Sequence, residues 1–289
     1  MKTKNKICNT SIVLSIFEYV LMYGWLIIIL FPFTWIISLA LRNLEEVYTA
    51  LFFPKHITFE NFIYLFKGTF PYRNIEINFL NALKNSFFVT LISVTLILLV
   101  SILASYAFSK LKFFGKSPLF YFILAGMMIP VQVIMLPLLR ITQVSMLQGS
   151  LFRIILPYIA LGIPLTTFLL TGFFRNIPAA LIEAAKIEGA GDWQILFRIM
   201  LPLAKPAIGA NIIFQFMYNW NEFPLALTLL QKSKLFTIPV EISKVQGQYM
   251  TPWNIVATTI ITAIIPVIIV YLIFQKQFVA GLTAGALKE

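Results

Sequence analysis

The side chains that could carry chemistry in this 289-residue chain are few and scattered. Cys8 and His56 are its only cysteine and histidine, so neither an internal disulfide nor a His/Cys metal cluster can form. Its eleven acidic residues stand mostly in polar segments, and no serine-centred motif accompanies them. General acid–base, nucleophilic and metal-dependent catalysis therefore lack the sets of side chains that they require.

Binding chemistry is better represented, as a row of polar side chains inside one apolar run. The row consists of Asn211, Gln215, Tyr218, Asn219 and Glu222. On a helix these spacings place the side chains on one stripe, with Asn219 beside it. Polar groups at membrane depth usually face a bundle interior or a wet cavity. The stripe either lines a translocation path or holds the helix to a partner subunit, and Gln132, between two prolines, has the same two interpretations.

Gly115-Lys116-Ser117 has the form of the end of a phosphate-binding loop. That loop needs a glycine five residues before Gly115, where this chain has Lys110, and no strand precedes it. We therefore interpret these residues as membrane-flanking charge and expect that the chain does not hydrolyse ATP itself.

The composition explains why catalytic side chains are scarce. The chain is 60% apolar and 11% charged, whereas an average soluble domain is about one-quarter charged. A soluble globule of this size could not bury so much apolar surface, and 28 phenylalanines exclude a disordered chain. The net charge of +11 is scattered between apolar runs and forms no basic stripe, so we expect membrane lipid and no nucleic acid as a partner.

Six apolar runs have the length of a membrane span, and each must be helical because lipid offers no partner for backbone amides. About 20 residues, at about 1.5 Å each, cross the hydrocarbon core. The runs are 19–41, 87–108, 119–139, 154–174, 207–230 and 255–274. We therefore predict an all-α polytopic membrane protein with six transmembrane helices in a single domain, residues 1–289. Pro130 and Pro137 are expected to kink the third span or divide it into two shorter helices.

The N-terminus imitates a secretion signal, since three lysines precede an apolar stretch that ends in Ser38-Leu39-Ala40. The run 19–41 has 23 residues, however, and the apolar region of a signal has about 7–15. We interpret it as a retained first span.

The short loop 109–118 carries Lys110, Lys112 and Lys116 and no acid, which indicates the cytosolic side. The alternation of spans then places both termini and segment 175–206 in the cytosol of a bacterium, and loops 42–86, 140–153 and 231–254 outside. Loop 42–86 contains an amphipathic run, 61–66, that is expected to pack on the membrane surface or on a partner.

Segment 175–206 predicts a short helix–turn–helix on the cytosolic face. Its boundary residues are Pro178, Gly189, Gly191, Asp192, Pro202 and Pro206. The first proline suits the start of a helix over 179–188, the glycines allow a tight reversal, and Asp192 is a candidate cap for a second helix. The last two prolines are predicted to stop that helix. An element of this kind is suited to docking in a groove of another protein.

The same segment resembles a known family. Glu183-Ala184-Ala185 is followed after three residues by Gly189, and after nine more by Ile199-x-Leu201-Pro202. This spacing is similar to the EAA signature of ABC-importer permeases. Further stretches that resemble the carbohydrate-importer branch, the maltose-permease-like subunits, are 128–133, 219–223, 246–249 and 281–286.

The resemblance implies a type I ABC-importer permease and a set of partners. These are a homologous second permease, two cytosolic ATPase subunits and an extracellular sugar-binding protein. The seven signature residues quoted above would couple the chain to an ATPase, and the tail from Gly281 would contact one as well. ATP and Mg²⁺ would be bound by the ATPase subunits, with no cofactor in this chain. Loop 231–254 would face the sugar-binding protein.

Two other classes of protein compete with this interpretation. A stand-alone secondary sugar transporter would need a coupling-ion site, and the sequence shows neither inverted-repeat symmetry nor many ionisable residues within its spans. An integral-membrane enzyme would need the catalytic sets that are missing.

Overall fold

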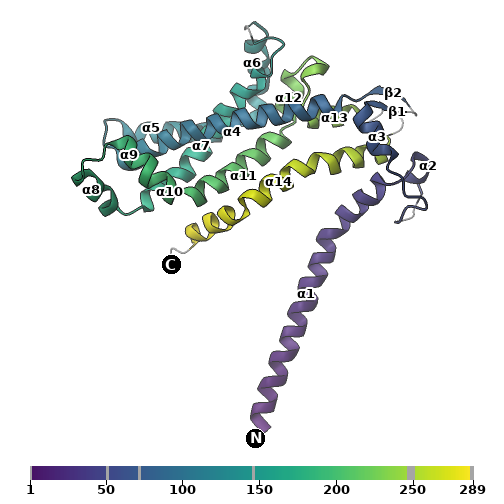
Figure 1. Ribbon diagram of the computed structural model, residues 1–289, viewed down its shortest axis with the longest axis horizontal. Coiled ribbons are helices and arrows are strands. Elements are labelled where there is room, and N and C mark those ends of the chain that lie inside the picture. The colour runs from purple at the N-terminus through teal and green to yellow at the C-terminus, as the bar shows by residue number, and fades with distance from the viewer. Residues whose placement is uncertain (1, 50–51, 71–72, 145–146, 246–250, 287–289) are drawn as a thin grey trace. The chain divides into compact units, whose positions relative to one another are not determined.

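The structure is a computed structural model that describes the backbone of residues 2–49, 52–70, 73–144, 147–245 and 251–286, and the side chains of 15–49, 52–69, 77–143, 147–245 and 251–279. Over these residues the chain is almost entirely helical, as the sequence predicts (Figure 1). The all-α prediction is confirmed, and a small antiparallel hairpin of β1 (Thr69–Phe70) and β2 (Arg73–Glu76) is added to the helices.

The chain divides into two compact units, which we describe separately. The first combines Met1–Ile77 with Val245–Thr262, and the second combines Asn78–Lys244 with Ala263–Glu289. The long helix α14 (Trp253–Ala286) contributes its start to the first unit and the remainder to the second. That the whole chain acts as one membrane domain stays a prediction.

In the first unit, α1 (Lys2–Ala40) is followed by α2 (Leu44–Val47) and α3 (Glu60–Lys67). The amphipathic run 61–66 lies within α3. Asn61 ties the unit together: its Nδ2 donates to the carbonyl oxygens of Ala40 and Arg42, 2.8 Å each, and its Oδ1 accepts from Nδ2 of Asn254 at 3.0 Å. The start of α14 is thereby fixed to the end of α1.

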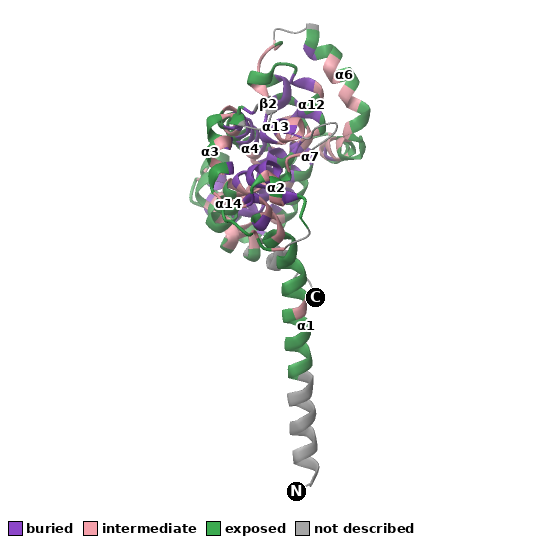
Figure 2. Cartoon of the chain, turned by 90° about the vertical axis from the view of Figure 1, so that its right-hand side faces the viewer, coloured by how far each residue is buried: buried purple, intermediate pink, exposed green. Residues whose placement is uncertain are grey.

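Most described side chains of α1 are exposed, and nearly all of these are apolar (Figure 2). Trp25 and Ile27 have exposed fractions of 66% and 67%. A helix with such a surface is stable only where lipid or another membrane chain covers it, because water would penalise the exposed apolar area.

In the second unit, α4 (Phe79–Lys110) packs along α7 (Phe152–Asn176), and α11 (Lys205–Asn221) packs on both. Small residues allow the close approach. Gly162 of α7 has no space for a Cβ, which would collide with Ile97 of α4 and lie 2.9 Å from Oε1 of Gln215 on α11. Buried serines of α4 donate to carbonyl oxygens of α7, as Ser105 Oγ does to Thr167 at 3.1 Å. Such small and hydroxyl-bearing side chains are typical of helix contacts in membranes.

Four of the six predicted spans are confirmed as helices long and apolar enough to cross a membrane within the described residues. They are Ser15–Ala40, Phe79–Lys110, Phe152–Asn176 and Trp253–Val279. Two further helix pairs have the composition of a span and are sharply bent, so the described residues provide six spans if each pair counts as one.

The first bent pair corrects the boundaries of predicted span 119–139. Lys116–Met128 and Val131–Gln143 meet at 94°, with the break at Ile129 and Pro130. Proline cannot donate its backbone nitrogen, so it removes one helix bond at the break. Pro137 lies inside α6 (Val131–Val144).

Predicted span 207–230 is wrong as one continuous helix. Asp192–Leu203 and Lys205–Asn221 meet at 75°, α11 ends at Asn221, and a separate α12 (Pro224–Leu229) follows. The sequence predicted one continuous run because only Glu222 and Phe223 separate the two helices. A single acidic residue lowers the mean hydropathy of such a run too little to divide it. Further helices of the unit, in addition to those of segment 175–206, are α5 (Lys116–Ala125), η1 (Gly126–Met128), η3 (Ser233–Leu235) and α13 (Ile238–Val245).

Candidate functional site

The segment with the EAA-like signature begins with α8 (Ala179–Ile187), directly after Pro178. Gly189 lies two residues after the end of α8 and has a φ of +84°, a conformation that glycine adopts without steric cost. Its N–H donates to the carbonyl of Lys186 at 3.0 Å, and the N–H of Ala190 donates to that of Ala185 at 2.9 Å. The predicted reversal at the glycines is therefore confirmed.

The second helix of the segment differs from the prediction at its start and ends between the two predicted stops. Gly191, not Asp192, precedes α9 (Asp192–Ile195) as its cap, and its N–H donates to Oε1 of Gln194 at 3.0 Å. The backbone continues through a π-helical turn, η2 (Leu196–Met200), into α10 (Leu201–Leu203). Asp192–Leu203 is one continuous helical run, and it ends at Leu203, one residue after the predicted stop Pro202. The break falls at Ala204, and Pro206 lies in the first turn of α11.

The signature residues separate into an inner and an outer set. Ala185 is buried, and Ile199 and Leu201 are partly buried, in an apolar cluster with Tyr106 of α4 and Phe174 of α7. Glu183, Ala184, Gly189 and Pro202 are exposed. The inner set packs the segment onto the ends of the long helices, which leaves the outer set available to a partner.

The segment also exposes large apolar side chains, which we call the outer apolar set: Leu181, Ile187, Trp193 and Phe197. Ile187 is 88% exposed and Trp193 is 65% exposed. The rings of Trp193 and Phe197 stack with centroids 5.9 Å apart. Sequence reasoning overlooked this set, although two aromatic residues four apart in a polar segment were a usable indication. Exposed aromatic side chains of this kind mark interaction surfaces.

The polar side chains of the stripe on α11 differ in how far they are buried. Gln215 is 3% exposed, and its Nε2 donates to Oγ1 of Thr166 at 2.9 Å and to the carbonyl of Gly162 at 3.3 Å. These bonds join α11 to α7 inside the chain. The sequence left open whether the stripe attaches its helix to a partner subunit. The contact of Gln215 that the structure describes attaches α11 to α7 of the same chain.

Glu222, directly after α11, makes a second contact with α7 and caps the start of α12. Its carboxylate accepts from the hydroxyl of Tyr158 at 2.6 Å, and from the N–H groups of Leu225 and Ala226 at 2.7 and 3.0 Å. A carboxylate at a helix start satisfies otherwise unpaired N–H groups. This buried cap explains why α11 and α12 are separate helices.

Asn211 and Asn219 are 3% and 4% exposed, and their Nδ2 atoms donate to carbonyl oxygens of their own helix at 2.8 and 2.7 Å. Their Oδ1 atoms, like Oε1 of Gln215, have no hydrogen-bond partner in the described part of the chain. Tyr218, in contrast, is 47% exposed, and Gln132 is exposed on α6. Only these two of the six predicted path residues are accessible in the chain; that any of them lines a path stays a prediction.

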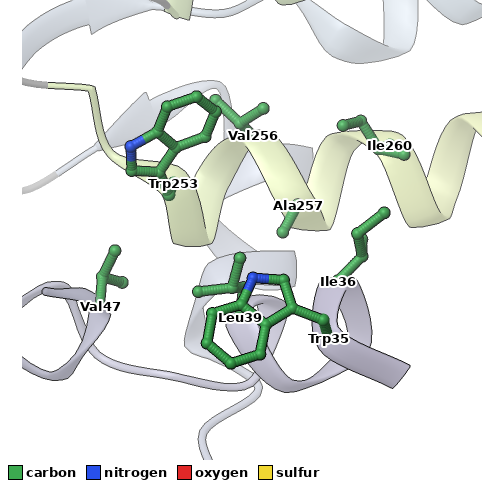
Figure 3. A pocket seen from close by; sticks show the side chains of 8 residues that line it. All are labelled: Trp35, Ile36, Leu39, Val47, Trp253, Val256, Ala257 and Ile260. Atoms are coloured by element: carbon green, nitrogen blue, oxygen red, sulfur yellow. The ribbon is translucent and has the colours of Figure 1, made fainter. Parts of the chain in front are cut away.

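A cavity of ≈ 480 Å³ lies in the first unit, between the end of α1, α2 and the start of α14 (Figure 3). Its lining is Trp35, Ile36, Leu39, Val47, Trp253, Val256, Ala257 and Ile260. Apart from the two indole N–H groups, these side chains offer no hydrogen bond, so the cavity lacks the polar groups that a sugar requires.

Three other features were singled out in the sequence, and the structure describes the side chains of one of them. Lys116 of the phosphate-loop look-alike donates through Nζ to the carbonyl of Leu111 at 2.8 Å, which is a contact within its own loop. The stretch 246–249 lies outside the described residues. The tail 281–286 continues the backbone of α14, and its side chains are not among those described.

Comparison with known proteins identifies the family of the chain. Residues 97–283 match the family described as binding-protein-dependent transport system inner membrane component. The chain is 35% identical over 261 residues to a sulfoquinovosyl glycerol transport system permease protein of Agrobacterium fabrum, covering 90% of this chain and 89% of the relative. It is 35% identical over 235 residues to an arabinooligosaccharides transport system permease protein of Bacillus subtilis, covering 81% and 80%.

A trehalose transport system permease protein of Mycobacterium tuberculosis is also 35% identical, over 261 residues that cover 90% of this chain and 92% of the relative. Among solved structures, a bacterial ABC transporter involved in the import of the acidic polysaccharide alginate shares the fold with a TM-score of 0.76 at 24% identity, covering 92% of this chain and 96% of that one. The chain therefore belongs to the family of binding-protein-dependent transport system inner membrane components, as a multi-pass permease subunit of the ABC-importer type.

Proposed function

We propose that this chain is one of two permease subunits of an ATP-driven importer for a sugar or oligosaccharide, and that it forms half of the translocation path. The three relatives named above carry sulfoquinovosyl glycerol, arabinooligosaccharides and trehalose in their names, and all are carbohydrates or glycosides. A homologous second permease would supply the other half. An extracellular sugar-binding protein would deliver the substrate, as suggested by the solved alginate ABC transporter in complex with a pentasaccharide-bound periplasmic protein.

The outer apolar set is the observation that supports coupling to a separate ATPase. Exposing an isoleucine and two stacked aromatic rings to water raises the free energy of the segment, unless a partner covers them. Two cytosolic ATPase subunits would provide that cover and would bind ATP and Mg²⁺, with no cofactor in this chain. The proposal places segment 175–206 and both termini in the cytosol, in agreement with the lysines of loop 109–118.

Within the path, accessible groups are better candidates for substrate contact than buried ones. Tyr218 offers a half-exposed ring and hydroxyl, and Gln132 offers an exposed amide. Asn211, Gln215 and Asn219 would instead stabilise the position of α11, because their side chains are enclosed by the chain itself.

The decisive experiment replaces Ile187 by Asp in the complete importer. Ile187 is 88% exposed, so the substitution should leave folding unchanged while a charge in the docking surface prevents ATPase association. We expect loss of ATPase copurification and of sugar uptake. Phe114→Asp is the matched control, because Phe114 is fully exposed in the loop between α4 and α5. Gly189 is a poorer position for this test, since its positive φ would strain any other residue.

Normal copurification and uptake by the Ile187→Asp importer would refute docking through this surface. A second measurement addresses the stand-alone secondary transporter: the purified chain alone, in liposomes, should take up no sugar with or without an ion gradient. Uptake under those conditions would favour the secondary transporter.

A further inference from the structure

The last turn of α4 holds the signature segment at both ends of α8. The hydroxyl of Tyr106 donates to Oδ1 of Asp192 at 2.9 Å, and Nζ of Lys110 donates to the carbonyl oxygen of Ile177 at 2.9 Å. Ile177 lies two residues before α8 begins, and Asp192 begins the next helix. Tyr106 and Lys110 are four residues apart, so they occupy one face of α4. We call these two residues and their two hydrogen bonds the α4 clamp.

Between the two ends, α8 has little else to fix its position. Of its nine residues, only Ile182 and Ala185 are buried. A helix this short is not stable by itself in water, so its position depends on tertiary contacts. The bond from Tyr106 ends on a carboxylate in the first turn of α9, and a hydrogen bond to a charged acceptor is stronger than one between neutral groups.

The other end of the clamp is a long, rigid helix. Above its last turn, α4 packs along α7 through bonds such as Ser101 Oγ to the carbonyl of Ile163 and Ser105 Oγ to that of Thr167. It also packs on α11, which carries the polar stripe. A displacement of α8 and α9 would therefore move α4, and α4 would move its neighbours, if the clamp holds.

We propose that Tyr106 and Lys110 are positioning residues for energy coupling: the α4 clamp passes the movement of α8, driven by the ATPase, to the membrane helices. The proposal rests on the proposed function, because it requires an ATPase docked on the segment. It assigns a role to Tyr106, Lys110 and Asp192, which the signature does not include.

The test uses the complete importer in liposomes and measures sugar imported per ATP hydrolysed. Tyr106→Phe keeps the buried ring and removes only the hydroxyl. We expect the ratio to fall about tenfold or more, the effect of losing one charge-assisted hydrogen bond, with subunit assembly and basal ATP hydrolysis unchanged. Asp192→Ala should cause the same loss, and the double variant should be no worse than either single variant, since both remove one interaction. Asp192→Asn retains an acceptor oxygen and should restore most of the ratio.

Tyr121→Phe is the matched control, because Tyr121 is 68% exposed on α5; it should keep the normal ratio. For the second bond, Lys110→Met should lower the ratio and Lys112→Met, in the adjacent loop, should not. Hydrogen exchange of the α8 amides in the isolated permease gives an independent measurement, and it should accelerate in Tyr106→Phe.

A normal ratio and normal exchange in Tyr106→Phe would overturn the clamp. If Ile187→Asp still abolishes uptake in that case, the docking surface stands and only the clamp is wrong. If Ile187→Asp is also without effect, the proposed docking of an ATPase through this surface fails as well.

Discussion

The signature segment and the polar stripe of α11 reverse the usual distribution of side chains in opposite ways. The segment, which would lie in water, exposes Ile187 and Trp193. The stripe, in a helix of membrane-span composition, buries Asn211 and Gln215. The consequences differ: an exposed apolar group needs a partner outside the chain, whereas the buried amide nitrogens of Asn211 and Gln215 donate to acceptors within it. We therefore expect substitutions in the stripe to change stability, and substitutions in the segment to change assembly and coupling.

The largest difference should appear between two glutamates, one from each region. Glu222→Ala would leave the Tyr158 hydroxyl and two N–H groups of α12 buried without a partner, which should lower the free energy of unfolding by about 3 kcal/mol or more. Glu183→Ala, on the exposed face of α8, should change it by less than about 0.5 kcal/mol. Thermal unfolding of the purified permease in detergent measures both. Equal shifts in the two variants would contradict the division between the regions.

Two glycines of α7 test the packing that encloses the stripe. A Cβ on Gly162 would collide with Ile97 and approach Gln215, whereas one on Gly172 would meet no atom within 4 Å. Gly162→Ala should therefore destabilise the permease by about 1–3 kcal/mol through overpacking. Gly172→Ala should stabilise it by up to about 1 kcal/mol, because alanine loses less backbone entropy in a helix. The same unfolding measurement decides, and a stable Gly162→Ala variant would show that α7 does not approach α4 and α11 this closely.

The two regions also differ in how far the sequence predicted them. Around Gly189, local chemistry determines the structure: proline and glycine restrict the backbone, and the helix and the reversal followed from them. The exit of the segment was also predicted, because the helical run ends at Leu203, between Pro202 and Pro206. The π-helical turn η2 was not.

In the stripe, periodicity correctly placed polar side chains on α11 and could not say which of them would be enclosed. Burial of Gln215 depends on Thr166, 49 positions away in the sequence. The break at Glu222 depends on Tyr158, 64 positions away. No local pattern contains these contacts. Tyr106 was overlooked for the same reason, since its partner Asp192 is distant in the chain.

Within the stripe, the smallest effect on stability is expected for Asn211→Leu, and this variant separates the two interpretations of the stripe. The substitution removes a buried Oδ1 that has no partner in the described residues and nearly conserves volume, so the free energy of unfolding should change by less than about 1 kcal/mol. Because Asn211 is 3% exposed, sugar uptake by the complete importer should remain normal. Tyr218→Ala, on the accessible side of the same helix, should lower uptake several-fold with no loss of assembly. If Asn211→Leu instead abolishes uptake at unchanged stability, the unpaired oxygen faces the substrate, and the path runs along the side of α11 that is enclosed here.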